Sequence, residues 1–139
     1  ESSAPSAVAR HMLELFRSAI SSGLATSIAH PLFPLGYFEQ YDRAVDTVSD
    51  MEFLDVFSTA AEQGVALEIT TAFLPSIKKK PFSIETPTRF LSLAKQAGCK
   101  STLGTDAHSP EEQKKLPELA ALIKAIGITE KDLKNNALP

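Results

Sequence analysis

The sequence lacks several features that would assign the protein to a special class. It has one cysteine, Cys99, so an internal disulfide is excluded and the thiol is expected to stay reduced. Its 14 basic residues do not outnumber its 17 acidic ones, so neither nucleic acid nor an anionic membrane is expected as a partner. No apolar run approaches the roughly 20 residues of a membrane span, and the first residues do not form a signal peptide. We therefore expect a cytoplasmic globular protein.

Three consecutive pairs of a helix and a strand are present instead. Apolar residues recur at helical spacing in the first half of each pair, and a glycine can end each helix. The expected strands are the short segments 26–29, 65–70 and 101–104. Short connections between such units imply right-handed crossovers. The expected fold class is α/β, with parallel strands and flanking helices.

Capping residues set the expected helix boundaries. Ser49 or Asp50 can cap the second helix, and Thr86, followed by a proline at the first helical position, can cap the third. After the third strand, a helical pattern runs through 109–126, with acidic residues near its start. A last short helix with a capping box is expected to begin at Thr129.

Polar residues lie at or near the C-terminal ends of the expected strands. His30, Glu68 and Asp106 come from three different units, and in parallel α/β sheets the working groups collect at this end. Pro31 is expected to force His30 into an extended backbone, although His30 could also be a core histidine bonded to a backbone carbonyl. Glu68 lies in an apolar strand, so it must face a metal, accept hydrogen bonds or pair with a lysine or arginine.

A candidate metal site follows the third strand. Residues 104–110 read Gly-Thr-Asp-Ala-His-Ser-Pro, which puts the carboxylate of Asp106 two residues before the imidazole of His108. Zinc, manganese and iron accept both ligand types, and a catalytic centre keeps one position open for water or substrate. The alternative is an aspartate that caps a helix and a histidine that is only solvated.

Several segments resemble the PHP family, the polymerase and histidinol phosphatase domains. Residues 90–110 resemble its final motif, in which Gly-Ser-Asp-Ala-His is usual. Residues 28–31, Ile-Ala-His-Pro, resemble its ligand histidine before proline, and residues 67–70, Leu-Glu-Ile-Thr, resemble its Glu-Ile-Asn strand. The tail around 122–133 is also similar, so the resemblance covers the chain from Thr26 onward.

The resemblance implies a metal-dependent phosphoesterase. Members of the family hold several divalent metal ions in a distorted barrel and hydrolyse a phosphate ester, so a small phosphorylated substrate and zinc, manganese or iron are expected here. Carried over by position, the metal ligands and catalytic groups would be His30, Asp106 and His108, with Glu68 as a supporting residue. Lys78 and Lys79 are the candidates for contacting substrate phosphate, although lysines on a loop are often only solvated.

The sequence also departs from the family pattern. The opening His-x-His motif and the intermediate His and Glu ligands are missing, since the chain has three histidines in all. Residues 1–139 are therefore expected to be the C-terminal portion of a single PHP-like domain, a partial (β/α) barrel with 1–10 as a loose arm, and to be inactive alone. Its exposed sheet edge predicts self-association or pairing with a missing N-terminal half. The alternative functions are a non-catalytic PHP-like scaffold or interaction module with a degenerate metal site, and another metal-dependent hydrolase.

Overall fold

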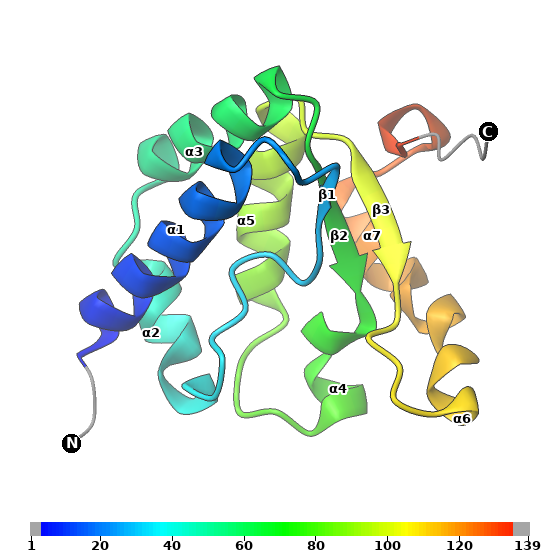
Figure 1. The fold of residues 1–139 in the computed structure, drawn as a ribbon. Helices are drawn as coiled ribbons and strands as arrows, with labels where there is room; N and C mark the ends of the chain where they lie inside the picture. Colours follow the sequence, from blue (N-terminus) through cyan, green and yellow to red (C-terminus); the bar gives the residue numbers. More distant parts are fainter. Residues whose placement is uncertain (1–3, 135–139) are drawn as a thin grey trace.

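The structure, a computed structural model, describes residues 4–134 apart from the side chain of Lys78. Figure 1 shows helices packed around a small sheet whose strands all run in one direction. The elements in chain order are α1 (Pro5–Ser21), β1 (Ser27–Ile28), η1 (Phe38–Gln40), α2 (Tyr41–Asp46), α3 (Asp50–Glu62), β2 (Ala66–Thr70), η2 (Thr71–Phe73), α4 (Pro75–Lys78), α5 (Glu85–Gln96), β3 (Ser101–Gly104), α6 (Pro110–Gln113), η3 (Leu116–Leu119), α7 (Ala120–Ile126) and η4 (Glu130–Asp132).

The sheet has three parallel strands in the order β1-β2-β3. Ile28 of β1 aligns with Leu67 of β2, and Glu68 of β2 aligns with Thr102 of β3. The expected α/β class with parallel strands and flanking helices is therefore confirmed. β1 is only two residues long, shorter than predicted, and the barrel form of the sheet stays a prediction.

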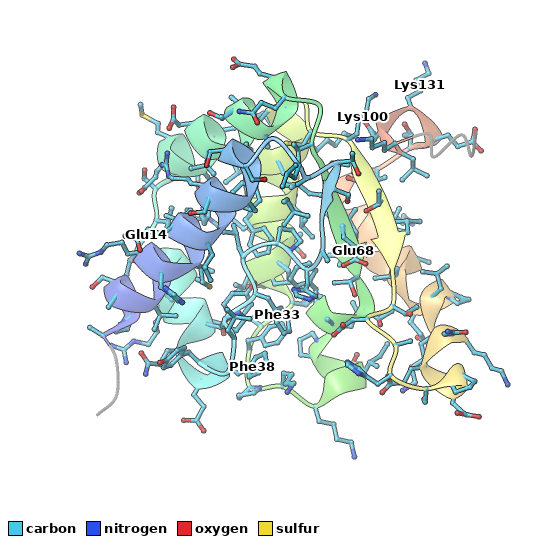
Figure 2. The ribbon with its side chains drawn as sticks, viewed as in Figure 1. Glu14, Phe33, Phe38, Glu68, Lys100 and Lys131 are labelled. Carbon is cyan, nitrogen blue, oxygen red and sulfur yellow. The ribbon has the colours of Figure 1, made fainter. Side chains whose placement is uncertain are left out.

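The two faces of the sheet differ because side chains alternate along each strand. Leu67 and Ile69 are buried in the hydrophobic core, together with Phe53, Phe57 and Phe90 from α3 and α5. Glu68 points to the opposite face and is only half-buried. Figure 2 shows it on the near side of the sheet, while α7 lies behind the sheet in the same view. The helices thus bury Leu67 and Ile69 on one face of β2, while Glu68 on the other face stays partly accessible.

The first helix begins earlier than expected. Residues 1–10 were predicted to be a loose arm, but α1 starts at Pro5, a residue suited to the first turn. Val8 and Ala9 are each only 3% exposed, so burial of their side chains offsets the entropy cost of ordering this turn. The prediction is wrong for residues 5–10, and residues 1–3 lie outside the described range.

Two of the predicted caps have different outcomes. Ser49 caps α3, because its hydroxyl accepts the backbone N–H of Glu52 at 3.2 Å. Thr86 was predicted to cap the third helix, with Pro87 as its first residue, but α5 begins two residues earlier, at Glu85, and Thr86 lies inside it. Its hydroxyl instead donates to the carboxylate of Asp42, which also accepts the backbone N–H of Ser83. A carboxylate from α2 thus fixes the start of α5, which no local pattern could indicate.

The helical pattern predicted over 109–126 is divided in the structure. Ser109 caps α6 through the N–H of Glu112 as expected, but the segment continues as a 3₁₀ turn and then as the separate helix α7. Pro117 lies at this division, where its missing N–H prevents a continuous helical ladder. Gly127 ends α7 in the left-handed conformation, as its position predicted.

Leu133 and Lys134 contact the chain at the N-terminal ends of the three strands. Leu133 bridges to Ser101 at the outer edge of β3, and the Nζ of Lys134 donates to the carbonyls of Thr26 and Gly64, which precede β1 and β2. The predicted capping box before it is present, because Asp132 accepts the N–H of Thr129 at 2.8 Å. Within residues 4–134, no helix is both long and apolar enough to cross a membrane.

Candidate functional site

Glu68, in the middle of β2, bonds to the chain just beyond the C-terminal end of β1. Its Oε2 accepts the backbone N–H of His30 at 2.8 Å, 38 residues away in sequence. Among the described residues Glu68 has no lysine or arginine partner, so the predicted alternative of a salt bridge is not what the structure contains. The carboxylate instead accepts a backbone hydrogen bond just beyond the short strand β1.

Glu68 also covers the end of β3. A Cβ atom built on Gly104 would lie 1.9 Å from Oε1 and 2.8 Å from Cδ of Glu68, so only glycine fits beneath this carboxylate. On the same face, the hydroxyl groups of Ser27 and Thr102 lie 3.1 Å apart across the sheet. One glutamate on the central strand therefore touches the ends of both neighbouring strands.

Asp106 and His108 form a pair on the loop between β3 and α6. The Nε2 of His108 lies 3.8 Å from the Oδ1 of Asp106, and the His108 side chain is 80% exposed. The backbone N–H of His108 donates to Glu112 at 2.6 Å, and the carbonyl of the neighbouring Thr105 accepts the hydroxyl of Thr71 at 2.7 Å. Hydrogen bonds thus hold the loop on both sides of Asp106, while the imidazole of His108 faces solvent.

Two of the three predicted metal ligands have a left-handed backbone. The φ angles are +29° at His30 and +50° at Asp106, a region that costs a side-chain-bearing residue roughly 1 kcal/mol or more. The expectation that Pro31 would force His30 to be extended is wrong, because the bond to Glu68 holds the His30 N–H in another direction. Such strain persists only where surrounding contacts hold it, and it concentrates at functional sites.

The predicted ligands do not all meet. The His30 ring packs near Phe33, with ring centroids 5.6 Å apart, rather than beside the pair of Asp106 and His108. Within the described part of the chain, no three His, Cys, Asp or Glu side chains are grouped closely enough to hold a metal ion. The structure therefore brings together two of the three predicted ligands.

Lys79, one of the two predicted phosphate contacts, lies in a separate hollow. Lys79 follows α4 in a left-handed conformation and lines a hollow of about 470 Å³ with Lys80, Tyr37 and Phe38. The Nζ of Lys80 lies 4.0 Å from the centre of the Phe38 ring, and neither Glu68 nor Asp106 lines this hollow. The side chain of Lys78 lies outside the described residues. Figure 2 places Phe38 beyond Phe33 on the side away from Glu68.

Three supporting residues escaped the sequence analysis. Thr71 and Glu112 hold the loop that carries Asp106 and His108, and Gly104 leaves space for the carboxylate of Glu68. The role of Gly104 in leaving space for Glu68 depends on the register of β2 and β3, in which Glu68 aligns with Thr102 and Thr70 with Gly104. The sequence alone does not give this register. Neither Thr71 nor Glu112 carried a recognisable signal in the sequence.

Comparisons of the chain with protein-family models, with curated proteins and with solved structures found no match.

Proposed function

We propose that this chain carries one corner of a metal-dependent phosphoesterase site, the activity implied by its resemblance to the PHP family. The observation that supports this best is the pair of Asp106 and His108, which are held 3.8 Å apart on one loop at the C-terminal end of a parallel sheet. This is the end of an α/β sheet at which ligands and substrates bind.

The pair fits two adjacent ligands of one divalent ion. Ligand atoms about 2.0–2.2 Å from a tetrahedral metal lie about 3.4 Å from each other, so a small rotation of the exposed His108 ring would suffice. Imidazole nitrogen with carboxylate oxygen suits zinc, manganese or iron. When bound, such an ion would activate water and stabilise charge on phosphoryl oxygens.

The residues of the chain would have distinct tasks at this site. Asp106 and His108 would be the ligands, and the bond from the His108 N–H to Glu112 would limit the movement of the loop. Glu68 would act as support by fixing the backbone of His30, whose ring would become a third ligand after rotating away from Phe33. This assigns the catalytic set to His30, Asp106 and His108.

Substrate phosphate would need a cation beyond the metal. Lys79 is exposed and belongs to the loops at the C-terminal end of the sheet, which supports its assignment to a small phosphorylated substrate. Lys78 keeps the same assignment from sequence alone. The hollow shared by Lys79 and Tyr37 would then receive a part of the substrate remote from the metal.

A complete site would need further strands, from a second copy or from an N-terminal half. β1 is an edge strand of the described sheet, and beside it lie Leu24 and Leu35, which are 88% and 58% exposed. A cavity of about 180 Å³ between α1 and the loop after β1 adds further apolar surface there. An open strand edge next to apolar surface favours pairing with another chain. Light scattering is expected to give a mass above that of one chain, and a monomer at high concentration would contradict self-association.

Metal analysis tests the proposed ligands directly. The chain would be loaded with manganese or zinc, freed of excess metal and compared with the Asp106→Ala and His108→Ala variants. Both variants are expected to lose most bound metal, whereas Glu111→Ala, which removes an exposed carboxylate on the neighbouring helix, is expected to retain it. Unchanged metal content in both ligand variants would contradict the assignment. Hydrolysis of p-nitrophenyl phosphate is expected only once the missing part of the site is supplied.

A non-catalytic scaffold with a degenerate site is the second candidate. It is favoured by the absence of a three-residue metal group within residues 4–134, and by the use of the Glu68 carboxylate in a backbone hydrogen bond. Metal content that stays below one ion per chain, even when the completing chain is present and the complex is formed, would favour the scaffold over the enzyme.

A further inference from the structure

A groove on the described surface lies away from the candidate metal site. It has a volume of about 720 Å³ and runs between α4 and the start of α5 on one side and η3 and α7 on the other. We call it the α5–α7 groove. None of His30, Glu68, Asp106 and His108 lines it, so its role is independent of the proposed chemistry.

The inner surface of the α5–α7 groove is mostly apolar. Leu74 and Leu122 form its floor, with exposures of 7% and 2%. Ile84 is 39% exposed on one wall, and Ala121 and Ala125 are exposed on the other. The two alanines are four residues apart on α7, so they share one helix face. A face of small side chains lets a second helix approach to the short end of the usual 8–10 Å interaxial range.

Two carboxylates at the groove have no ion-pair partner among the described residues. Glu85 at the start of α5 and Glu118 in η3 both line the groove and are exposed, and neither carboxylate forms an ion pair or hydrogen bond with any residue that the structure describes. Among the side chains that the structure describes, no lysine or arginine lines the groove. A partner that presents cations beside an apolar surface would therefore neutralise both carboxylates.

We propose that the α5–α7 groove binds a basic amphipathic helix of a partner protein. The apolar stripe of the helix would lie over the floor leucines and the alanine face of α7, and lysine or arginine residues beside that stripe would approach Glu85 and Glu118. The groove follows α7, which spans seven residues, so it accommodates about two turns of a bound helix.

The experiment uses the full chain and a defined probe. The probe is a fluorescein-labelled peptide of about four helical turns, with leucines at i, i+3, i+4 and i+7 spacing and lysines elsewhere, and the matched peptide carries glutamate in place of lysine. Binding is measured by fluorescence anisotropy at low and at high salt. The lysine peptide is expected to bind more tightly than the glutamate peptide and to weaken as salt rises.

Variants of the chain decide whether the groove is responsible. Ala121→Arg, which adds bulk and a positive charge on an exposed position, is expected to weaken binding more than about tenfold, because the apolar stripe would have to cover a charge. Glu85→Gln with Glu118→Gln is expected to weaken it about three- to tenfold. The matched control, Glu14→Gln on the outer side of α1, is expected to leave binding unchanged.

Three results would overturn the proposal. They are equal binding of the lysine and glutamate peptides, binding that survives Ala121→Arg, and a loss of affinity in the Glu14 control as large as that in the groove variants. Far-UV circular dichroism of each variant verifies that the fold is retained. The measurement is made without metal, so its outcome does not depend on whether the phosphoesterase proposal is correct.

Discussion

Replacing Gly104 with alanine tests the contact of Glu68 with the end of β3 and with the backbone beyond β1. The new Cβ would lie 1.9 Å from Oε1 of Glu68, so the carboxylate must swing away and release the N–H of His30. A hydrogen bond to a charged group contributes about 1.5–3 kcal/mol, and the partial exposure of Glu68 argues for the lower end. Gly104 does not have a positive φ, so alanine is otherwise compatible with its backbone. We expect Gly104→Ala to lower the free energy of unfolding by about 2 kcal/mol.

A double-mutant cycle isolates the cause of this loss. Once Glu68 is alanine, the space above Gly104 is empty, so Gly104→Ala should be neutral or should stabilise by about 0.4–1 kcal/mol through the unfolded chain. In a Glu68→Gln background the amide has the same shape, so the steric cost should persist. Urea unfolding followed by circular dichroism gives the four free energies of the cycle. Equal effects of Gly104→Ala with Glu68 present or truncated would refute the proposed contact.

Three further predictions concern residues outside the site. Burial raises the pKa of the Cys99 thiol to about 11, so Ellman's reagent should react slowly with it at pH 8 until urea unfolds the protein. The free energy of unfolding contributed by the neutral thiol should be lost as the pH rises from about 9 towards 11. The backbone N–H of Thr129 holds the pKa of Asp132 below its usual range, so the ionised carboxylate stabilises the fold above about pH 4 and this stability is lost as the pH falls further. Acid unfolding should show that Asp132→Asn lacks this contribution. Lys134→Met removes two hydrogen bonds to carbonyls and should cost about 1 kcal/mol by urea unfolding, against no change for the exposed Lys124→Met.

The strands and most helix ends could be predicted from local patterns. Residues 101–104 form β3 as predicted, and Ser49 and Ser109 cap their helices because a capping hydroxyl needs only the N–H three residues ahead. Thr86 failed as a cap because a distant carboxylate, that of Asp42, competed for its hydroxyl. The capping signals of Ser49 and Ser109 thus held because no distant partner competed for their hydroxyl groups.

The candidate site was predictable in composition but not in geometry. Asp106 and His108 are two residues apart, so their proximity follows from the loop itself. Glu68 was expected to need a partner, and its partner is the N–H of His30, which depends on how far β1 extends beside β2. The direction of the His30 ring, towards Phe33, depends on a loop that follows no periodic pattern.

By itself, the sequence determined the α/β class, the parallel strand direction and the residue types at the C-terminal ends of the strands. The class and the residue types follow from apolar periodicity and from glycine and capping signals, which act over a few residues. The strand direction follows from the general preference for right-handed crossovers between parallel strands. Only the tertiary structure decided that Glu68 of β2 contacts the chain beyond β1 and the end of β3, that a side chain at Gly104 would displace its carboxylate, and that an apolar groove lined by two exposed glutamates lies beside α7. These features depend on strand register and helix packing, which are set by contacts between residues far apart in the chain.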